Sequence, residues 1–348
     1  MFKFLEALGI PPRILNAIKL LYQDTKAKVV APEGDTDFLD ISAGILQGDT
    51  LAPYLFCIVL DYVMRKALHG KEEALGFTIE HRRSSRYPPV VITDLDFADD
   101  IALLCEEIEA AQELLLNVET EALKVGLGLN AKKTEVQPLN ITRPIGITSM
   151  DGVFLNEVSN FKYLGSWTES SEKDFSVRKA LAWVACHKLK NIWTSNMKRK
   201  LKERLFISTV KSVLLYGSES WTINKQLEKK INGTYTKMLR MALNVSWKQM
   251  LPNIVLYQDL PPLTEKIKVR RMRIAGHCAR HSDEVAHDVL LWQPQLGMKR
   301  GRPKKTFVDC LLEDAGVENH RELSMLMKDR DQWKSRVMAK ERPISRPK

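Results

Sequence analysis

Two adjacent carboxylates, Asp99 and Asp100, interrupt an apolar stretch at residues 90–105. An apolar run, a short turn and a second apolar run predict a β-hairpin that carries both aspartates at its turn. Two carboxylates beside an apolar core repel each other and lose hydration, and a bound divalent cation such as Mg²⁺ would remove both penalties. Because Asp is a common turn residue, a plain hairpin without metal is the alternative. The apolar residues that would bury the strands are Val91, Ile92, Leu95, Ile101, Leu103 and Leu104.

Polar residues in neighbouring elements are candidates for binding a substrate. Gln47 lies in a loop between Gly44 and Gly48, just before a largely apolar helix predicted at residues 52–68. A loop of this kind can present backbone N–H groups and the Gln47 amide to a nucleotide or a base pair. The alternative is an ordinary loop that only caps the helix. Lys133 follows an amphipathic helix predicted at residues 106–125, in a turn where it is either solvated or placed to protonate a phosphate.

The 348-residue chain has a formal net charge of +10 that is distributed unevenly. Residues 1–171 carry a net charge of −9, whereas residues 172–348 carry +19. A strongly basic second half predicts a polyanionic partner, and nucleic acid is the first candidate because Lys and Arg neutralise its phosphates. A solvated basic surface without a partner is the alternative.

Cysteine usage and hydropathy indicate the compartment. The five cysteines are scattered and form no C-x-x-C pair, which is typical of reduced thiols and argues against a zinc knuckle. The sequence shows neither a run of about 18 uncharged apolar residues nor the pattern of a signal peptide. We therefore expect a nuclear or cytoplasmic protein that is not secreted and has no membrane partner. The sequence does not indicate an oligomeric state.

The second half shows helical periodicity almost to its end, and its tryptophans are predicted to lie in a core rather than to stack on bases. KRGRPKK at residues 299–305 resembles an AT-hook or a nuclear import signal, with a solvated basic loop as the alternative. His277 and His281 lie four residues apart, but the sequence offers no third ligand in the expected pattern, which predicts ordinary helix histidines. The candidate nucleic-acid-binding residues are Lys198, Arg199, Lys200, Arg270, Arg271, Arg300 and Arg302.

Four segments in this order resemble the palm of a reverse transcriptase of the non-LTR retrotransposon (LINE-like) class. GILQGDTLAPYLF at residues 44–56 resembles the family's motif B, and FADD at residues 97–100 resembles motif C, the usual metal-binding box. LNAKKTEV at residues 129–136 resembles motif D, and FKYLGS at residues 161–166 resembles motif E, the primer grip. Downstream segments resemble the thumb and the C-terminal part of such elements, so the resemblance covers nearly the whole chain.

The resemblance implies an α+β fold in three parts. These are a partial polymerase palm with an antiparallel sheet and helices at residues 1–170, an all-helical thumb at 171–250 and a basic helical C-terminal region at 251–348. The implied activity is RNA-directed DNA synthesis from dNTPs on an RNA template and a DNA primer, with Mg²⁺ or Mn²⁺ as cofactor.

The resemblance also implies roles for single residues. Asp99 and Asp100 would be metal ligands, and Lys133 would protonate pyrophosphate. Gln47 and Gly48 would contact the nascent base pair. The implied primer grip comprises Phe161, Tyr163, Leu164 and Gly165.

One departure from the family concerns its motif A, which supplies a further metal-ligating Asp from a strand before the first helix seen here. The resemblance therefore implies a chain truncated before motif A. Asp94 and Asp96 are doubtful substitutes, because strand alternation places them on the face opposite Asp99. We expect little or no polymerase activity from the chain alone, and the alternative function is a non-catalytic nucleic-acid-binding remnant.

Overall fold

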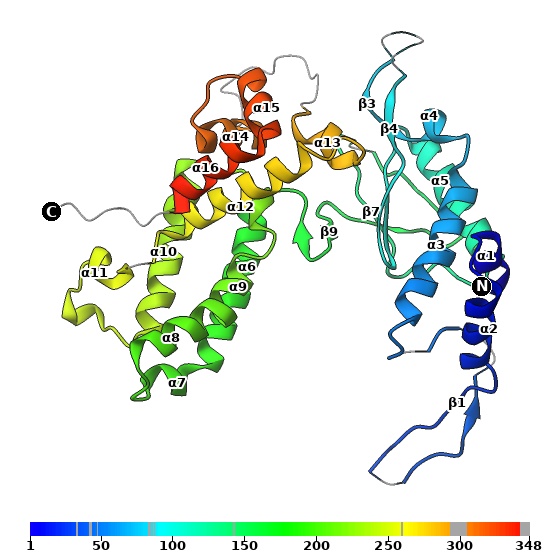
Figure 1. Cartoon of the computed structure of the whole chain (residues 1–348), viewed down its shortest axis with the longest axis horizontal. Helices are drawn as coiled ribbons and strands as arrows, with labels where there is room; N and C mark the ends of the chain where they lie inside the picture. Colours follow the sequence, from blue (N-terminus) through cyan, green and yellow to red (C-terminus); the bar gives the residue numbers. More distant parts are fainter. Residues whose placement is uncertain are drawn as a thin grey trace. The chain divides into compact units, whose positions relative to one another are not determined.

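The computed structural model describes residues 1–348 except 33, 42, 43, 47, 83, 85, 87, 142, 259, 293–304 and 342–348. The chain divides into two compact units, Met1–Ser159 and Asn160–Lys348 (Figure 1). The first unit combines helices with short, mostly antiparallel strands, whereas helices dominate the second. This mixture is the α+β class that the sequence predicted. Residues 160–170, including the primer-grip segment, lie in the second unit.

Two small apolar clusters hold together the helices of the first unit. These helices are α1 (Phe2–Ala7), α2 (Pro12–Leu21), α3 (Ala52–Leu68), α4 (Glu72–Leu75) and α5 (Ile108–Leu123). One cluster joins α1 and α2 to the beginning of α3 around Leu5, Leu15 and Leu55. The other joins the rest of α3 to α4 and α5, with Leu114 completely buried. The helix predicted at residues 52–68 is confirmed, and Pro53 in its first turn suits a helix start.

The strands of the first unit pair two by two. They are β1 (Lys26–Ala27), β2 (Leu39–Asp40), β3 (Phe77–Glu80), β4 (Val90–Ile92), β5 (Asp94–Phe97), β6 (Asp100–Leu103), β7 (Glu135–Val136) and β8 (Asn156–Glu157). The pairs β1–β2, β3–β4 and β5–β6 are antiparallel, whereas β7–β8 is parallel. β4 and β5 are separated by Thr93 alone and take different partners, so the ladders stay separate among the described strands.

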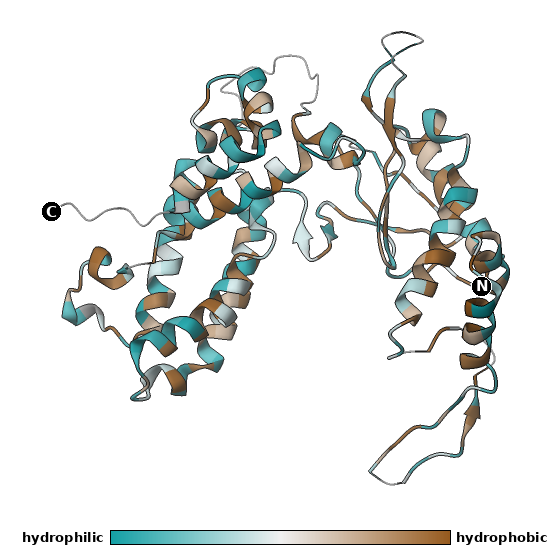
Figure 2. Cartoon of the chain, in the orientation of Figure 1, coloured by the Kyte–Doolittle hydropathy of each residue, from teal (hydrophilic) through white to brown (hydrophobic). Residues whose placement is uncertain are grey.

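Amphipathic helices build the second unit after one short hairpin, β9 (Lys162–Tyr163) and β10 (Ser166–Trp167). Figure 2 shows hydrophobic and hydrophilic residues alternating around these helices. The helical elements are α6 (Ser171–Lys188), α7 (Lys190–Thr194), α8 (Arg199–Phe206), the π-helical η1 (Ile207–Lys211), α9 (Ser212–Leu214), the 3₁₀ turns η2 (Ser218–Ser220) and η3 (Trp247–Gln249), α10 (Lys225–Ala242), α11 (Asn253–Tyr257), α12 (Leu263–Cys278), α13 (Val285–Leu290), α14 (Phe307–Ala315), α15 (His320–Lys328) and α16 (Arg330–Glu341).

Side-chain caps explain where the longer helices of this unit begin. Ser170 accepts a hydrogen bond from the third residue of α6, and Asn224 does the same for α10. Thr306 and Asp309 form a capping box at the start of α14. Gly316 ends α14 with a φ of 67°, in the left-handed region that favours glycine. Among the described residues, no helix combines the length and the apolar character needed to cross a membrane.

Two hydrophobic clusters make up the core of the second unit, and α12 contributes to both. Leu263 and Ile267, near its start, pack with α6, α8 and α10, whereas Met272, further along, packs with α14, α15 and α16. Trp193 and Trp221 are each only 1% exposed, which confirms their predicted core positions. Both indole N–H groups find acceptors, the carbonyl of residue 186 and the carboxylate of residue 174, each at 2.8 Å.

A buried ion pair lies near the junction of these two clusters. Arg271 of α12 and Asp314 of α14 are 2% and 4% exposed, and their closest N–O distance is 2.5 Å. Arg271 also donates to the carbonyl of Trp221 at 2.6 Å. Burial raises the pKa of Asp314, and the Arg271 guanidinium offsets part of that rise. Removal of either partner would leave a buried charge without its counterion.

We predict that Arg271→Met lowers the free energy of unfolding by about 3–5 kcal/mol, because it leaves Asp314 buried and unpaired. Urea denaturation followed by tryptophan fluorescence measures the change. Arg321→Met, at an exposed site, is the matched control and should change stability by less than about 0.5 kcal/mol. Equal effects of the two substitutions would contradict the prediction.

Candidate active site

The hairpin predicted around Asp99 and Asp100 forms from β5 and β6, which pair antiparallel in an unbroken register. Phe97 lies opposite Asp100, so Ala98 and Asp99 make up a two-residue turn. Ala98 has a φ of 53°, in the left-handed region that a residue with a Cβ adopts at a cost. The hairpin thus holds Asp99 at its tip and Asp100 at the start of the second strand, and both are exposed.

Side chains on this hairpin alternate between a face packed on helices and a face open to water. Ile101 and Leu103 pack against the cluster formed by α3 and α5. Leu95 and Phe97 share the other face with Asp100, and they are 41% and 63% exposed. The two faces therefore have different environments, and Asp100 belongs to the water-facing one.

A second group of carboxylates lies on the helix-facing side of the same hairpin. Asp94 and Asp96 share that face, and the charge of Asp61 in α3 acts on them. The pKa of Asp96 is raised to about 6, first by loss of hydration and then by its interactions with Asp94 and Asp61. Because this group lies on the face opposite Asp100, it is poorly placed to share a metal ion with that residue.

The loop before α3 takes the conformation that its glycines allow. Gly48 has a φ of 94°, which favours glycine. Asp49 accepts hydrogen bonds from the backbone N–H of Leu51 at 3.1 Å and from the Tyr22 hydroxyl at 3.3 Å, which ties the loop to α2. Burial raises the pKa of Tyr22, and the Asp49 carboxylate contributes to that rise. Gln47, the predicted nucleotide contact, lies outside the described residues.

Lys133 lies exposed at the end of the turn that follows α5. Its backbone N–H donates to the carbonyl of Asn130 at 2.9 Å, and β7 begins two residues later. Lys133, Gly48 and the aspartate hairpin thus come from three separate segments of the first unit. Among the predicted catalytic residues, Asp99 and Asp100 share the β5–β6 hairpin, whereas Lys133 lies in a different segment.

The predicted primer-grip residues form a tight hairpin in the second unit. Tyr163 pairs with Ser166, so Leu164 and Gly165 make up its two-residue turn, with φ values of 47° and 81°. Positive φ at both turn residues is the signature of a type I′ turn, which matches the twist of paired strands. The rings of Phe161 and Tyr163 stack with their centroids 6.3 Å apart.

Side chains from α6 and from the turn after α9 hold this hairpin in place. The Tyr216 hydroxyl donates to the carbonyl of Leu164 at 2.8 Å, and the Arg178 guanidinium donates to the carbonyl of Gly165. The same guanidinium lies 4.2 Å from the centre of the Tyr216 ring. Asp174 accepts from the backbone N–H of Trp167 at 3.3 Å. Both turn carbonyls and the outgoing strand are therefore fixed.

Sequence reasoning missed Asp174 and Arg178, although a signal was present. They lie four residues apart in α6, immediately after the primer-grip strand, so they share one face of that helix. Gly217 also contributes, because a Cβ added there would lie 2.2 Å from Ser166 Oγ. Gly217 also has a φ of 68°, so the left-handed backbone and the close approach to β10 together favour glycine.

The predicted basic residues differ in how much of their charge is available. Lys198 and Lys200 are exposed at the start of α8. Arg199, half-buried between them, donates to the carboxylate four residues later at 2.7 Å. Arg270, also half-buried, donates to the carbonyl of Leu215 at 2.6 Å. Lys198 and Lys200 therefore expose the most charge within this group.

Arg271 corrects the sequence prediction. It was expected to bind nucleic acid, but its guanidinium is buried in the ion pair with Asp314 and is not accessible to a ligand. Charge counting cannot separate such a core arginine from its exposed neighbours. Arg300 and Arg302, in the AT-hook-like segment, lie outside the described residues.

Arg270 belongs to a group of cations whose other members, Lys211 and Lys266, were not among the predicted binding residues. Lys211 of the π-helical segment is 8% exposed, and its ammonium lies 5.8 Å from the centre of the Tyr235 ring. Its pKa is lowered to about 8, first by burial and then by the charges of Lys266 and Arg270. A bound anion would relieve this repulsion.

Comparison with known proteins identifies the class. Residues 1–168 match the reverse transcriptase (RNA-dependent DNA polymerase) family. A transposon-derived protein of Caenorhabditis elegans is 28% identical over 262 residues, which cover 70% of this chain and 94% of that protein. A Pol polyprotein from the retrotransposable element R2 of Popillia japonica is 26% identical over 69% of this chain and 34% of its own length. The RNA-directed DNA polymerase of the mobile element jockey, from Drosophila funebris, is 25% identical over 80% of this chain and 30% of its own length.

These matches show that residues 1–168 are a reverse transcriptase domain. Together with the relatives from retrotransposable and mobile elements, this match supports a reverse transcriptase of the non-LTR, LINE-like kind. Divalent metal ions serve as cofactors in this family, and its substrates are dNTPs with a nucleic-acid template and primer. The chain spans only about a third of the length of the two polymerase-containing relatives described above.

We predict that the raised pKa of Asp96 makes the hairpin less stable as the pH rises. Between the ordinary Asp pKa of 3.8 and about 6, the unfolded chain ionises while the folded chain retains its proton, so stability falls across this window. Asp96→Asn should abolish that fall. Amide hydrogen exchange of residues 94–103, corrected for intrinsic rates at each pH, measures it. Asp151→Asn, at an exposed position, is the control and should leave the fall unchanged.

We predict opposite effects of two substitutions in the primer-grip turn. Leu164→Gly should stabilise the turn, because it removes a Cβ from a left-handed residue. Gly165→Ala should destabilise it by about 1–2 kcal/mol, because it creates the same strain. Its Cβ would also lie 3.4 Å from both Arg178 and Tyr216. Amide exchange in β9 and β10 measures both effects, and a stabilising Gly165→Ala would contradict the assigned turn.

Proposed function

We propose that this chain is part of a retrotransposon RNA-directed DNA polymerase and that Asp99 and Asp100 form one side of its catalytic metal site. The observation that carries the proposal is the two-residue turn between β5 and β6. It exposes both carboxylates while the opposite face of the hairpin packs on helices. This arrangement suits a site that must admit both metal ions and substrate.

The oxygen-only donor set of this hairpin fits a hard divalent cation such as Mg²⁺ or Mn²⁺. Asp99 would be the ligand shared by two ions and Asp100 the auxiliary ligand. When bound there, such ions would lower the pKa of the primer hydroxyl and stabilise the leaving pyrophosphate. Asp61, Asp94 and Asp96 occupy the other face and would not complete this set.

The remaining roles follow the family resemblance. Lys133, exposed in its turn, would donate a proton to pyrophosphate. Gly48, together with Gln47, would contact the nascent base pair. The primer-grip residues, held by Arg178 and Tyr216, would position the primer end. Such an enzyme would act in the nucleus or the cytoplasm.

We further propose that the 348 residues alone extend primers poorly. The family's motif A contributes another Asp to the metal site, and we identify no counterpart of it in this sequence. A metal held from one side by a single hairpin would bind weakly and would be poorly positioned for in-line transfer.

One observation favours binding of nucleic acid even without synthesis. The pKa of Lys211 is lowered mainly by burial, and the charges of Lys266 and Arg270 lower it further. A phosphodiester backbone would offset the repulsion between these charges. A nucleic-acid-binding protein that retains the reverse transcriptase fold is therefore the second candidate.

Primer extension on a poly(A)–oligo(dT) template with Mg²⁺ or Mn²⁺ tests the first proposal, with Asp99→Ala and the control Asp151→Ala alongside. We expect extension near background for all three proteins. Mn²⁺ binding in the presence of duplex and dTTP, followed by electron paramagnetic resonance, should weaken in Asp99→Ala and not in Asp151→Ala. If the unaltered chain extends primers and Asp99→Ala abolishes this extension, the proposal of poor activity is wrong, but the proposed catalytic site is supported. Extension that survives Asp99→Ala would overturn the site itself.

Duplex binding at increasing salt tests the second candidate. We expect Lys266→Gln to reduce the slope of log affinity against log salt by about 0.7–0.9, the contribution of one phosphate contact. Lys328→Gln, at an exposed position in α15, is the control and should leave the slope unchanged. Equal slopes for all variants would contradict a phosphate contact at this cluster.

A further inference from the structure

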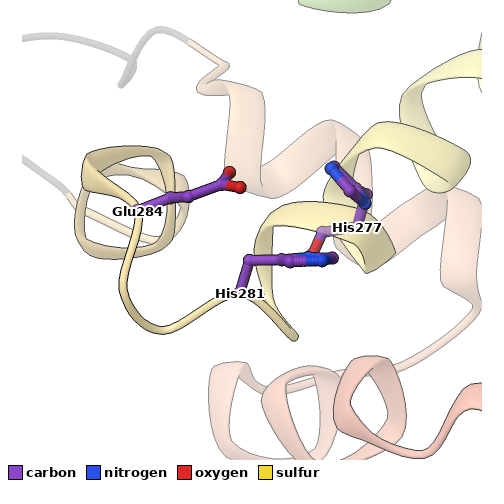
Figure 3. Close-up of side chains that lie close together, drawn as sticks. All are labelled: His277, His281 and Glu284. Atoms are coloured by element: carbon purple, nitrogen blue, oxygen red, sulfur yellow. The ribbon is translucent and has the colours of Figure 1, made fainter. Parts of the chain in front are cut away.

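Two histidines and a glutamate converge where α12 gives way to α13 (Figure 3). His277 lies in the last turn of α12, His281 lies just beyond it, and Glu284 immediately precedes α13. One ligand atom from each residue lies within 4.8 Å of the others. The sequence predicted ordinary helix histidines because it offered no third ligand in the expected pattern. The turn supplies that ligand.

Local backbone geometry explains why the three side chains meet. Residues four apart on a helical turn share one face, which brings His277 and His281 together. Their ring centroids are 4.1 Å apart. The backbone N–H of Glu284 donates to the carbonyl of His281 at 3.2 Å, so the chain folds back and returns the glutamate to the same side.

A hydrogen bond prepares His281 for metal binding. Its Nδ1 lies 2.8 Å from the backbone carbonyl oxygen of His277. A carbonyl can only accept, so Nδ1 carries the proton in the neutral ring and Nε2 keeps its lone pair. Histidines that ligate metals usually donate their other ring N–H to a carbonyl or a carboxylate in this way.

We propose that His277, His281 and Glu284 bind a divalent transition metal ion, with Zn²⁺ as the best fit. Two imidazole nitrogens and one carboxylate oxygen are typical zinc ligands, and Mg²⁺ prefers oxygen alone. In tetrahedral geometry with bonds of about 2.0–2.1 Å, ligand atoms lie about 3.3 Å apart. Small rotations of the exposed His277 and Glu284 side chains towards the half-buried His281 would close the remaining separation, and water would take the fourth position.

Charges around the site are mixed. Arg280 lies in the same turn, but its guanidinium donates to the carbonyl of Met327 at 2.9 Å and is therefore engaged elsewhere. Arg273 precedes His277 by one turn, and Asp283 and Asp288 flank Glu284 along the chain. The carboxylate of Glu284 adds the negative charge that two neutral imidazoles lack.

A metal ion at this position would have a structural role. It would fix α13 to the end of α12, at the junction that leads along the chain towards the basic segment at residues 299–305. This role is independent of the polymerase proposal, because none of the three residues belongs to the reverse transcriptase motifs.

Zinc titration of the full chain tests the proposal. The chain is stripped with a chelator and titrated with Zn²⁺ against a chromophoric competitor, in excess Mg²⁺ that saturates oxygen-only sites. We expect one Zn²⁺ per chain. His281→Gln and Glu284→Gln should each weaken binding by at least about 10-fold, because even loss of an outer hydrogen bond to a ligand costs about 10- to 100-fold.

His320→Gln is the matched control, because His320 is an exposed histidine at the start of α15. Its zinc affinity should equal that of the unaltered chain. X-ray absorption of the zinc-loaded chain should show two imidazoles among the nearest ligands, which tests the site without any substitution. Zinc affinity unchanged by His281→Gln, or a spectrum without two imidazoles, would overturn the proposal. Binding that survives Glu284→Gln undiminished would overturn the three-ligand set.

Discussion

The two-residue turn between β5 and β6 is the constraint on which the arrangement of the carboxylates depends. Side chains in a strand alternate with a period of two, so the length of this turn decides which residues face the helices. With Phe97 opposite Asp100, apolar Ile101 packs inward and Asp100 remains in water. A slip by one residue would bury Asp100 and expose Ile101. The strained φ of Ala98 is tolerated because the packed strands on both sides determine the turn.

The primer-grip hairpin is maintained differently, because its strands are too short to support themselves. β9 and β10 have two residues each, and an isolated hairpin of this length is not stable in water. Its turn carbonyls instead accept hydrogen bonds from Arg178 of α6 and from Tyr216 in the turn after α9. The aspartate hairpin thus depends on apolar packing of one face, whereas the primer-grip hairpin depends on side chains that satisfy its backbone.

Local patterns in the sequence predicted much of this structure. The apolar runs around Asp99 predicted the hairpin, and the unbroken apolar stretch from Ala52 predicted α3 with its observed bounds. The prediction was wrong for Leu95, which is 41% exposed, and Val91 and Ile92 lie instead in β4, which pairs with β3. Features that depend on distant residues could not be predicted. Arg271 looks like its exposed neighbours until Asp314, 43 residues later, packs against it. Glu284 approaches His277 only because the chain turns back after α12. Helical periodicity in the sequence does not predict where such a turn occurs.

Helix α12 has a consequence for how the second unit unfolds. Its first turns complete one hydrophobic cluster and its later turns complete the other, and Arg271 bonds across to Trp221. Neither cluster can lose this helix without exposing apolar surface in the other. Cooperativity should therefore extend across the whole unit, with a single unfolding transition rather than two. A destabilising substitution at one end of this unit would therefore lower the stability of the other end as well.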